Sequence, residues 1–188
     1  PEPLPSDIKN LKRPVIGYLG NIQGRIDWVI MEAIAKSFPQ TSILVIGPSP
    51  SKEHPDYKAL ITLLRFPNCC YIGAKPQEDI MKYICSFDIC IIPEPLRPLN
   101  IAGCPQKLWN YFASSRPIVS TAIPEQMLWQ PMVKIANGPD SFVASIKNLI
   151  ENGCDDGMGE ERLNIARNHT WEKLGERLTN EIKSRGIV

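Results

Sequence analysis

Residues 89–121 read ICIIPEPLRPLNIAGCPQKLWNYFASSRPIVST. Residues 89–92 and 117–120 form short, largely apolar runs, which are typical of strands covered on both faces. Between them, residues 106–114 carry apolar side chains at helical spacing. The loop before that helix is longer than about ten residues, and loops of that length are usually functional or disordered. The stretch therefore predicts a strand, a functional loop, a helix and a second strand.

The same alternation extends outward in both directions. Further strands are predicted at 15–19, 42–46, 69–72 and 132–135, and helices at 27–38, 56–64 and 78–85. The last third is helical, with segments at 141–150, 160–168 and 171–185 and a Gly- and Asp-rich loop at 152–159. Strand–helix alternation predicts an α/β fold, a doubly wound, Rossmann-like parallel sheet of about six strands with helices on both faces.

Length and composition are those of one ordinary domain. The chain has 188 residues, of which 43% are hydrophobic and 22% charged. These values suit a single soluble globular domain. The formal net charge of +1 gives no indication of a nucleic-acid or acidic-membrane partner. No apolar run approaches the roughly 20 residues that span a bilayer. We expect a linker or boundary segment at 1–13, the domain at 14–168 and its closing helix at 169–188.

The cysteines and histidines do not form a recognisable chemical site. None of the six cysteines shows CxxC spacing, and only two histidines are present, so no metal site is expected. Four cysteines lie in or beside apolar runs, which indicates a reducing, cytoplasmic compartment. Neither histidine neighbours a nucleophile signature, and His54 is expected to be exposed to solvent.

Ligands of open parallel sheets bind beyond the carboxyl ends of the strands. The loops that follow the predicted strands are therefore the places to look for a site. They are residues 20–25, 47–51, 73–77, 93–106 and 121–126.

These loops and their flanking elements resemble those of one family. Residues 93–125, with the strand before them, resemble the donor-site segment of family-4-like GT-B glycosyltransferases, which typically reads Pro-x-Lys-Leu-x-Glu-Tyr-Leu-Ala-x-Gly-x-Pro-Val-Val-x-Thr. Residues that stand in register are Pro105, Lys107, Leu108, Tyr111, Ala113, Pro117, Val119 and Thr121. VIGYLGNIQGRIDW, SILVIGP, NCCYIGAKPQEDIMKYICSFDICIIP and NHTWEKLGERL resemble other family segments in the same order. The resemblance runs from about residue 13 to 185 and is strongest to the bacterial branch that builds envelope and exopolysaccharide chains.

The resemblance implies the C-terminal, nucleotide-sugar-binding half of a GT-B fold, with the N-terminal acceptor half absent from this chain. The implied reaction moves a sugar from a nucleoside diphosphate donor to an acceptor hydroxyl, with retention and without a metal. The nucleotide sugar is a substrate, and no cofactor is implied. The isolated chain is expected to bind donor weakly and to turn nothing over. Contact with the inner face of the membrane is expected only through the absent half.

Five residues are candidates for the donor diphosphate. Lys107 lies one turn into a predicted helix, where free N–H groups also attract anions, and the family uses the matching Lys on phosphate. An exposed surface Lys is the alternative. Arg25, one place from the family's usual cation, is a possible substitute or an exposed structural Arg. Gly20, Gly103 and Cys104 are expected to offer backbone N–H groups, or to be plain turn residues.

Asn110 is the main departure from the family pattern. The resemblance puts a ribose-binding Glu there, and Asn keeps hydrogen-bonding capacity without charge. Ala102 replaces a second acidic residue. Altered donor choice, weak affinity and lost catalysis stay open, so the alternative is a non-catalytic nucleotide- or sugar-binding module. Ala74 and Lys75 are candidates for backbone contact with the base. Glu94 could orient the donor sugar, although a solvated loop carboxylate is the more usual placement.

Other function classes fit less well. No acidic cluster follows the first strand, which disfavours a response-regulator or flavodoxin-like domain. The first loop lacks GxGxxG, which disfavours a dinucleotide-binding oxidoreductase. His169 has no catalytic partner in the sequence, and the resemblance makes Trp171 a packing anchor of the final helix.

Overall fold

Six parallel strands form one sheet in the computed structural model, which describes residues 5–103 and 106–185. The strands are β1 (Val15–Leu19), β2 (Ser42–Ile46), β3 (Cys69–Tyr71), β4 (Ile89–Ile92), β5 (Ile118–Ser120) and β6 (Lys134–Ile135). Their order is β3-β2-β1-β4-β5-β6, with every neighbouring pair parallel. The predicted doubly wound sheet is therefore confirmed. The order reverses between β1 and β4, and such a reversal opens a crevice at the carboxyl ends of the strands.

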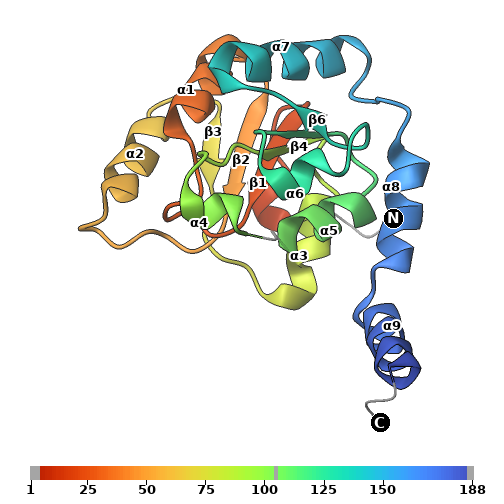
Figure 1. The fold of residues 1–188 in the computed structure, drawn as a ribbon. Coiled ribbons are helices and arrows are strands. Elements are labelled where there is room, and N and C mark those ends of the chain that lie inside the picture. The colour runs from red at the N-terminus through yellow and green to blue at the C-terminus, as the bar shows by residue number, and fades with distance from the viewer. Residues whose placement is uncertain (1–4, 104–105, 186–188) are drawn as a thin grey trace.

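Helices cover both faces of the sheet, as Figure 1 shows. One face carries α1 (Trp28–Ser37), α2 (Pro55–Leu63) and α7 (Gly138–Glu151), and the other carries α3 (Ile80–Ile84), α5 (Gln106–Ala113) and α8 (Gly159–Asn168). Side chains alternate between the faces along each strand. In β1, for example, Ile16 and Tyr18 pack in the first apolar cluster, and Val15 and Leu19 pack in the second. This two-sided burial is the reason for the continuous apolar runs in the sequence.

The structure contains short elements that the sequence pattern did not predict. They are the 3-10 turn η1 (Ser6–Ile8) and the four-residue helices α4 (Pro98–Ile101) and α6 (Pro124–Met127). The helix predicted at 78–85 begins as a second 3-10 turn, η2 (Gln77–Asp79). Within residues 1–13, the expected linker or boundary segment, Ile8 is buried in the second cluster. Asp7 also forms an ion pair with Lys75 at 2.7 Å. The hydrogen bonds from Lys75 and Tyr83 outweigh the effect of burial and hold the pKa of Asp7 below its usual value.

Helix α8 closes the second face against α5. Arg162 is fully buried there, and its guanidinium pairs with Asp156 at 2.9 Å and donates to the Met132 carbonyl at 2.8 Å. At the end of α8, the His169 ring stacks on Trp109 with centroids 4.5 Å apart. His169 therefore belongs to an aromatic cluster that ties the end of α8 to α5.

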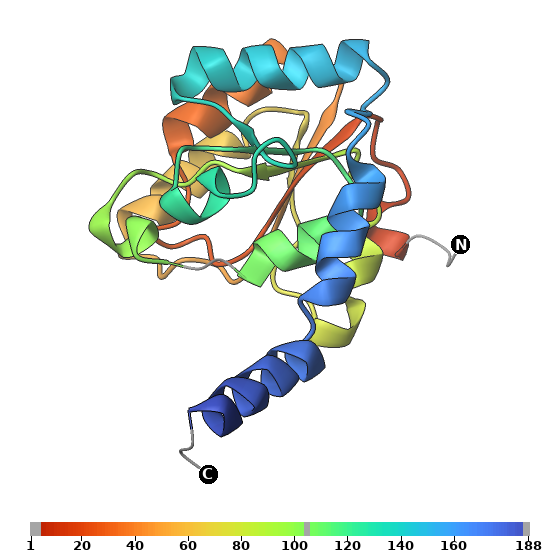
Figure 2. The same cartoon turned by 45° about the vertical axis from the view of Figure 1, so that its right-hand side comes forward.

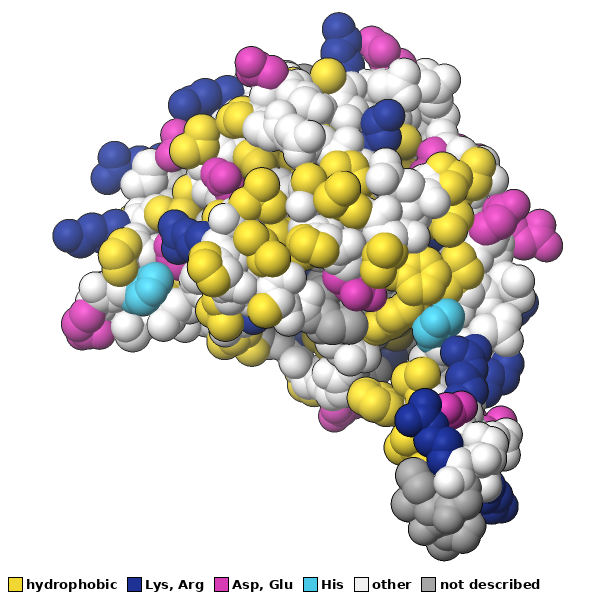
Figure 3. All heavy atoms as spheres, in the orientation of Figure 1, with side chains coloured by type: hydrophobic (Ala, Val, Ile, Leu, Met, Phe, Trp, Pro, Cys, Tyr) yellow, Lys and Arg dark blue, Asp and Glu magenta, His cyan; other side chains and the backbone are white. Residues whose placement is uncertain are grey.

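The final helix, α9 (Trp171–Ser184), leaves the body of the domain (Figure 2). Thr170 caps its start by accepting from the Lys173 N–H at 3.3 Å, as Thr can at an N-cap. Trp171 is 79% exposed, so its expected role as a packing anchor is wrong for this chain. The reason is that, within the described residues, the helix buries none of its side chains against another element. Figure 3 shows the same helix as a projection beneath the domain.

Candidate functional site

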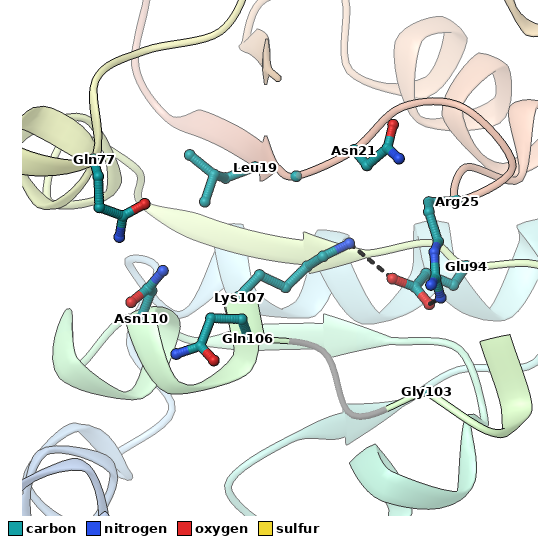
Figure 4. A pocket seen from close by; sticks show the side chains of 10 residues that line it. Leu19, Asn21, Arg25, Gln77, Glu94, Gly103, Gln106, Lys107 and Asn110 are labelled. Carbon is teal, nitrogen blue, oxygen red and sulfur yellow. Dashed lines mark hydrogen bonds and ion pairs between the residues drawn. The ribbon is translucent and has the colours of Figure 1, made fainter. Parts of the chain in front are cut away.

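A cavity of about 360 Å³ lies beyond the carboxyl ends of the strands, where β1 and β4 diverge. It is bounded by the loop after β1, the loop after β4 and the first turn of α5 (Figure 4). This is the crevice that the reversal of strand order predicts. Its lining residues are Leu19, Gly20, Asn21, Arg25, Gln77, Glu94, Gly103, Gln106, Lys107 and Asn110.

Helix α5 positions two of the lining side chains. Leu108, Tyr111 and Phe112 are fully buried in the second cluster and fix the rotation of the helix. Lys107 and Asn110, three residues apart, therefore both face the cavity. The Tyr111 hydroxyl accepts from the Leu19 N–H at 2.8 Å, which joins α5 to the end of β1.

Lys107 lies at the centre of the site. It is 8% exposed, and its Nζ lies 2.7 Å from Glu94 Oε1, 3.2 Å from the Tyr18 hydroxyl and 4.5 Å from the centre of the Tyr18 ring. The alternative of an exposed surface Lys is therefore wrong. Burial alone would lower the pKa of Lys107, but Tyr18 and Glu94 outweigh it and raise the pKa above its usual value. The ammonium consequently stays charged at neutral pH.

Glu94 is 2% exposed, which overturns the expectation of a solvated loop carboxylate. The physical reason is its pairing with two cations, Lys107 at 2.7 Å and Arg25 at 3.8 Å. The loop after β4 is anchored to the residue that follows β5, because the Thr121 hydroxyl donates to the Glu94 carbonyl at 2.7 Å. Buried carboxylates are retained when such partners compensate their lost hydration.

Arg25 is brought to the same cavity. Its Nη1 donates to Asn100 Oδ1 at 2.8 Å, and Asn100 in turn donates to the Pro95 carbonyl at 2.8 Å. Asn100 is 1% exposed and links the loop after β1 to the loop after β4. Arg25 is half-buried, and its bond to Asn100 fits the structural role that was the alternative, so its contact with phosphate stays a prediction. Asn100, a residue without a sequence signature, holds the guanidinium at the site.

The two glycines of the site act through their missing side chains. The Gly20 N–H donates to the Ile46 carbonyl at 2.9 Å, and the Gly103 N–H donates to the Asn100 carbonyl at 3.1 Å. The expectation that these N–H groups serve a ligand is therefore wrong. A Cβ on Gly20 would lie 2.9 Å from Lys107 Cε, and one on Gly103 would lie 3.3 Å from Arg25 Nη1. Both glycines leave room for a cation.

Of the remaining predicted residues in the described part of the chain, one lines the cavity and three do not. Asn110 lines the cavity, whereas Ala102 is exposed and outside the lining. Ala74 and Lys75 are also outside it, and Lys75 is paired with Asp7, so their contact with a base stays a prediction. Cys104 lies outside the described residues.

Three polar lining residues were missed, namely Asn21, Gln77 and Gln106. Gln77 belongs to the segment after β3 in which Ala74 and Lys75 were chosen, and Asn21 and Gln106 border Gly20 and Lys107. Their only available signal was a position at the carboxyl end of a strand or at the start of a helix.

The first loop is tied to α2 through Asp56. This carboxylate accepts from the Gly24 N–H at 2.6 Å and from Trp28 Nε1 at 2.9 Å. His54 caps α2, because its Nδ1 accepts from the Asp56 N–H at 3.2 Å. His54 is half-buried rather than exposed, since this cap holds the ring against the helix.

The cavity combines fixed positive charge with polar ends. Arg25 and Lys107 supply two cations against one carboxylate, and the first turn of α5 leaves N–H groups without intrahelical acceptors. Such a site can hold an anion at its centre and hydroxyl or amide groups around it. In the described residues, no three His, Cys, Asp or Glu side chains gather as a metal site would require, and no helix is long and apolar enough to cross a bilayer.

Known proteins are similar to this chain in sequence or in fold. TuaH of Bacillus subtilis (strain 168), named as a glycosyltransferase of teichuronic acid biosynthesis, is 29% identical over 164 residues, which are 85% of this chain and 41% of TuaH. The Anabaena protein HepE, solved with UDP-glucose, superposes with a TM-score of 0.76 at 13% identity over 95% of this chain and 50% of that chain. A trehalose-6-phosphate structure from E. coli bound with UDP-2-fluoro glucose gives a TM-score of 0.72 at 14% identity over 97% and 48% of the two chains.

The structural matches show that the fold is that of GT-B glycosyltransferases, of which the chain spans about half the length. The family model of the glycosyl transferases group 1 matches residues 13–152, which is well over half of the chain. With the fold, the crevice between β1 and β4 and this match in agreement, the chain belongs to the glycosyl transferases group 1 family.

Proposed function

We propose that this chain is the nucleotide-sugar-binding half of a glycosyltransferase that moves a sugar from a nucleoside diphosphate to an acceptor hydroxyl. The observation that carries the proposal is the position of Lys107, buried and charged in the crevice between β1 and β4. Arg25 lies at the same cavity and adds a second cation. HepE, which shares the fold, was solved with UDP-glucose, and this supports a donor of that class.

The chemistry follows from charge. Negative charge grows on the departing diphosphate in the transition state, and cations fixed in advance stabilise it. The pair with Glu94 and the contact with Tyr18 fix Lys107 in place, so it needs little rearrangement to meet a phosphate. We propose that the transfer retains the anomeric configuration and proceeds without a metal, on the strength of the family resemblance.

The acceptor is proposed to bind the part of the glycosyltransferase that lies outside this chain. The chain spans about half the length of the structures that it matches, so the other half is available for the acceptor. We therefore expect donor binding without turnover from these 188 residues. Envelope or exopolysaccharide assembly is the proposed setting, which the name of TuaH supports.

Calorimetric titration of the chain with UDP, GDP and ADP tests the proposal. One of the three should bind saturably, and Lys107→Gln should weaken it about tenfold or more, since a hydrogen bond to a charged group is worth about 1.5–3 kcal/mol. Gln keeps a donor for Glu94, which limits damage to the fold. Lys58→Gln, which removes an exposed charge of α2, should leave the affinity unchanged. Binding of none of the three at millimolar concentration would overturn the proposal.

A non-catalytic binding module is the second candidate. It is favoured by the uncharged Asn110 at the position of the family's ribose-binding acid. Asn110→Glu, titrated with the same nucleotides, separates the two. A large gain in affinity indicates a decayed site, and a loss indicates a site adapted to Asn.

A further inference from the structure

One oxygen of a buried carboxylate at the site has no hydrogen-bond donor within the described part of the chain. Glu94 Oε1 accepts from Lys107 at 2.7 Å, whereas Oε2 lies 3.8 Å from Arg25 Nη1, which is beyond hydrogen-bond distance. That Nη1 donates instead to Asn100 Oδ1 at 2.8 Å. Glu94 is only 2% exposed and lines the cavity. A carboxylate oxygen at the wall of a cavity can therefore accept a hydrogen bond from a donor that enters the cavity.

The cavity has two ends that differ in chemistry. Figure 4 shows Gln77 and Asn110 at one end and Arg25 and Glu94 at the other, with the Lys107 chain running between them. A phosphate at Lys107 would therefore have amide side chains on one side and a carboxylate on the other. A nucleoside suits the amide end, since ribose and base both donate and accept hydrogen bonds. The group beyond the phosphates would then reach Glu94.

We propose that Glu94 is a specificity-determining residue, whose Oε2 accepts a hydrogen bond from a hydroxyl of the transferred sugar. A sugar hydroxyl is a donor that fits beside two cations without adding charge, and hydrogen bonds to an ionised acceptor are about twice as strong as neutral ones. The inference rests on the proposed function, because it takes the diphosphate to lie at Lys107.

The same carboxylate opposes the binding of phosphate. Glu94 offsets one of the two positive charges of the cavity, so its removal should favour a bare nucleoside diphosphate. After removal of the carboxylate, a nucleoside diphosphate sugar gains the same reduction in repulsion, but it loses the hydrogen bond from its sugar hydroxyl to Glu94. A group that is merely structural would weaken both ligands alike. The ratio of the two affinities therefore separates recognition of the sugar from support of the fold.

The experiment is calorimetric titration of the wild type and Glu94→Gln with UDP, GDP and ADP and with UDP-glucose, GDP-glucose and ADP-glucose. For the nucleotide that the wild type binds, Glu94→Gln should bind the diphosphate about threefold tighter, whereas the preference for the glucosyl ester over the diphosphate should fall about tenfold. Glu94→Asp keeps the negative charge, but the side chain is one methylene shorter, so its oxygens lie further from the sugar. It should lower the same preference and leave the affinity for the diphosphate within about twofold.

Glu78→Gln is the matched control, because it removes an exposed carboxylate next to the lining residue Gln77. It should leave the preference for the glucosyl ester unchanged. Saturable binding of a nucleotide with the same preference in wild type, Glu94→Gln and Glu94→Asp would overturn this inference alone. Equal weakening of both ligands would also overturn it. Failure of the wild type to bind any of the six compounds would overturn the proposed function, and this inference with it.

Discussion

Single glycines determine how closely the strand ends approach at the site. Gly47, which follows β2, has φ +155°, and a Cβ there would lie 1.9 Å from the Gly20 carbonyl oxygen. Gly47→Ala should therefore destabilise the domain by about 3 kcal/mol or more, since the backbone of the site loop must move. Urea unfolding followed by circular dichroism measures the loss.

Gly73→Ala separates the close contact from the backbone conformation. Gly73 follows β3 with φ +74°, but a Cβ there would meet nothing within 4 Å. Gly73→Ala should lower the free energy of unfolding only by the strain of the left-handed conformation, about 1 kcal/mol. Equal losses for Gly47→Ala and Gly73→Ala would mean that the loop of Gly20 moves freely.

The contrast between Lys107 and Glu94 shows how far the residues of the site can be predicted. The placement of Lys107 follows from local rules, because its position in the first turn of a helix is visible in the sequence. Glu94 depends on a contact with a residue 13 positions away in the sequence, which no periodicity reports. The N–H of Gly20 donates to the Ile46 carbonyl, which only the folded chain brings near, whereas that of Gly103 donates to the Asn100 carbonyl, three residues earlier at the end of the short helix α4.

Among the elements, α5 contributes most directly to the site, because it supplies Lys107 and Asn110 and is hydrogen-bonded to the end of β1. Its Tyr111 hydroxyl accepts from the Leu19 N–H at 2.8 Å, next to Gly20. Tyr111→Phe leaves that buried N–H without a partner and should destabilise the domain by about 1–3 kcal/mol. Tyr83→Phe is the matched control, because Asp7 keeps its bond to Lys75 at 2.7 Å when the Tyr83 hydroxyl is lost. Thermal unfolding compares the two variants. Equal decreases in melting temperature would show that the hydrogen bond between Tyr111 and Leu19 does not stabilise the domain more than the bond of Tyr83 does.

Long elements were predictable and short ones were not. The predicted strands and main helices recur within a few residues, because each has a continuous apolar run or a helical period. Helices α4 and α6 have four residues each, which is too short for a period to be visible. Both begin with a proline at the first helical position, so proline marked the element but was interpreted as part of a loop.

At the scale of the whole molecule, the reversal of strand order places the site, and α9 stands apart from it. Strand–helix alternation predicted the sheet, but no local pattern could show that α9 leaves the domain. Its sequence is as amphipathic as that of a packed helix, yet Trp171, Leu174 and Leu178 are exposed because no element in the described part of the chain covers them.

Removal of α9 should therefore leave the domain intact. A chain that ends at Thr170 keeps the stack of His169 on Trp109 and loses no buried residue of α9. Its free energy of unfolding in urea should stay within about 0.5 kcal/mol of the full chain, as for surface changes. A chain that ends at Gly157 also loses α8 with the fully buried Arg162, and it should not fold cooperatively. A loss of 2 kcal/mol or so from the first truncation would contradict the independence of α9, because a helix without packing contacts adds little to stability in water.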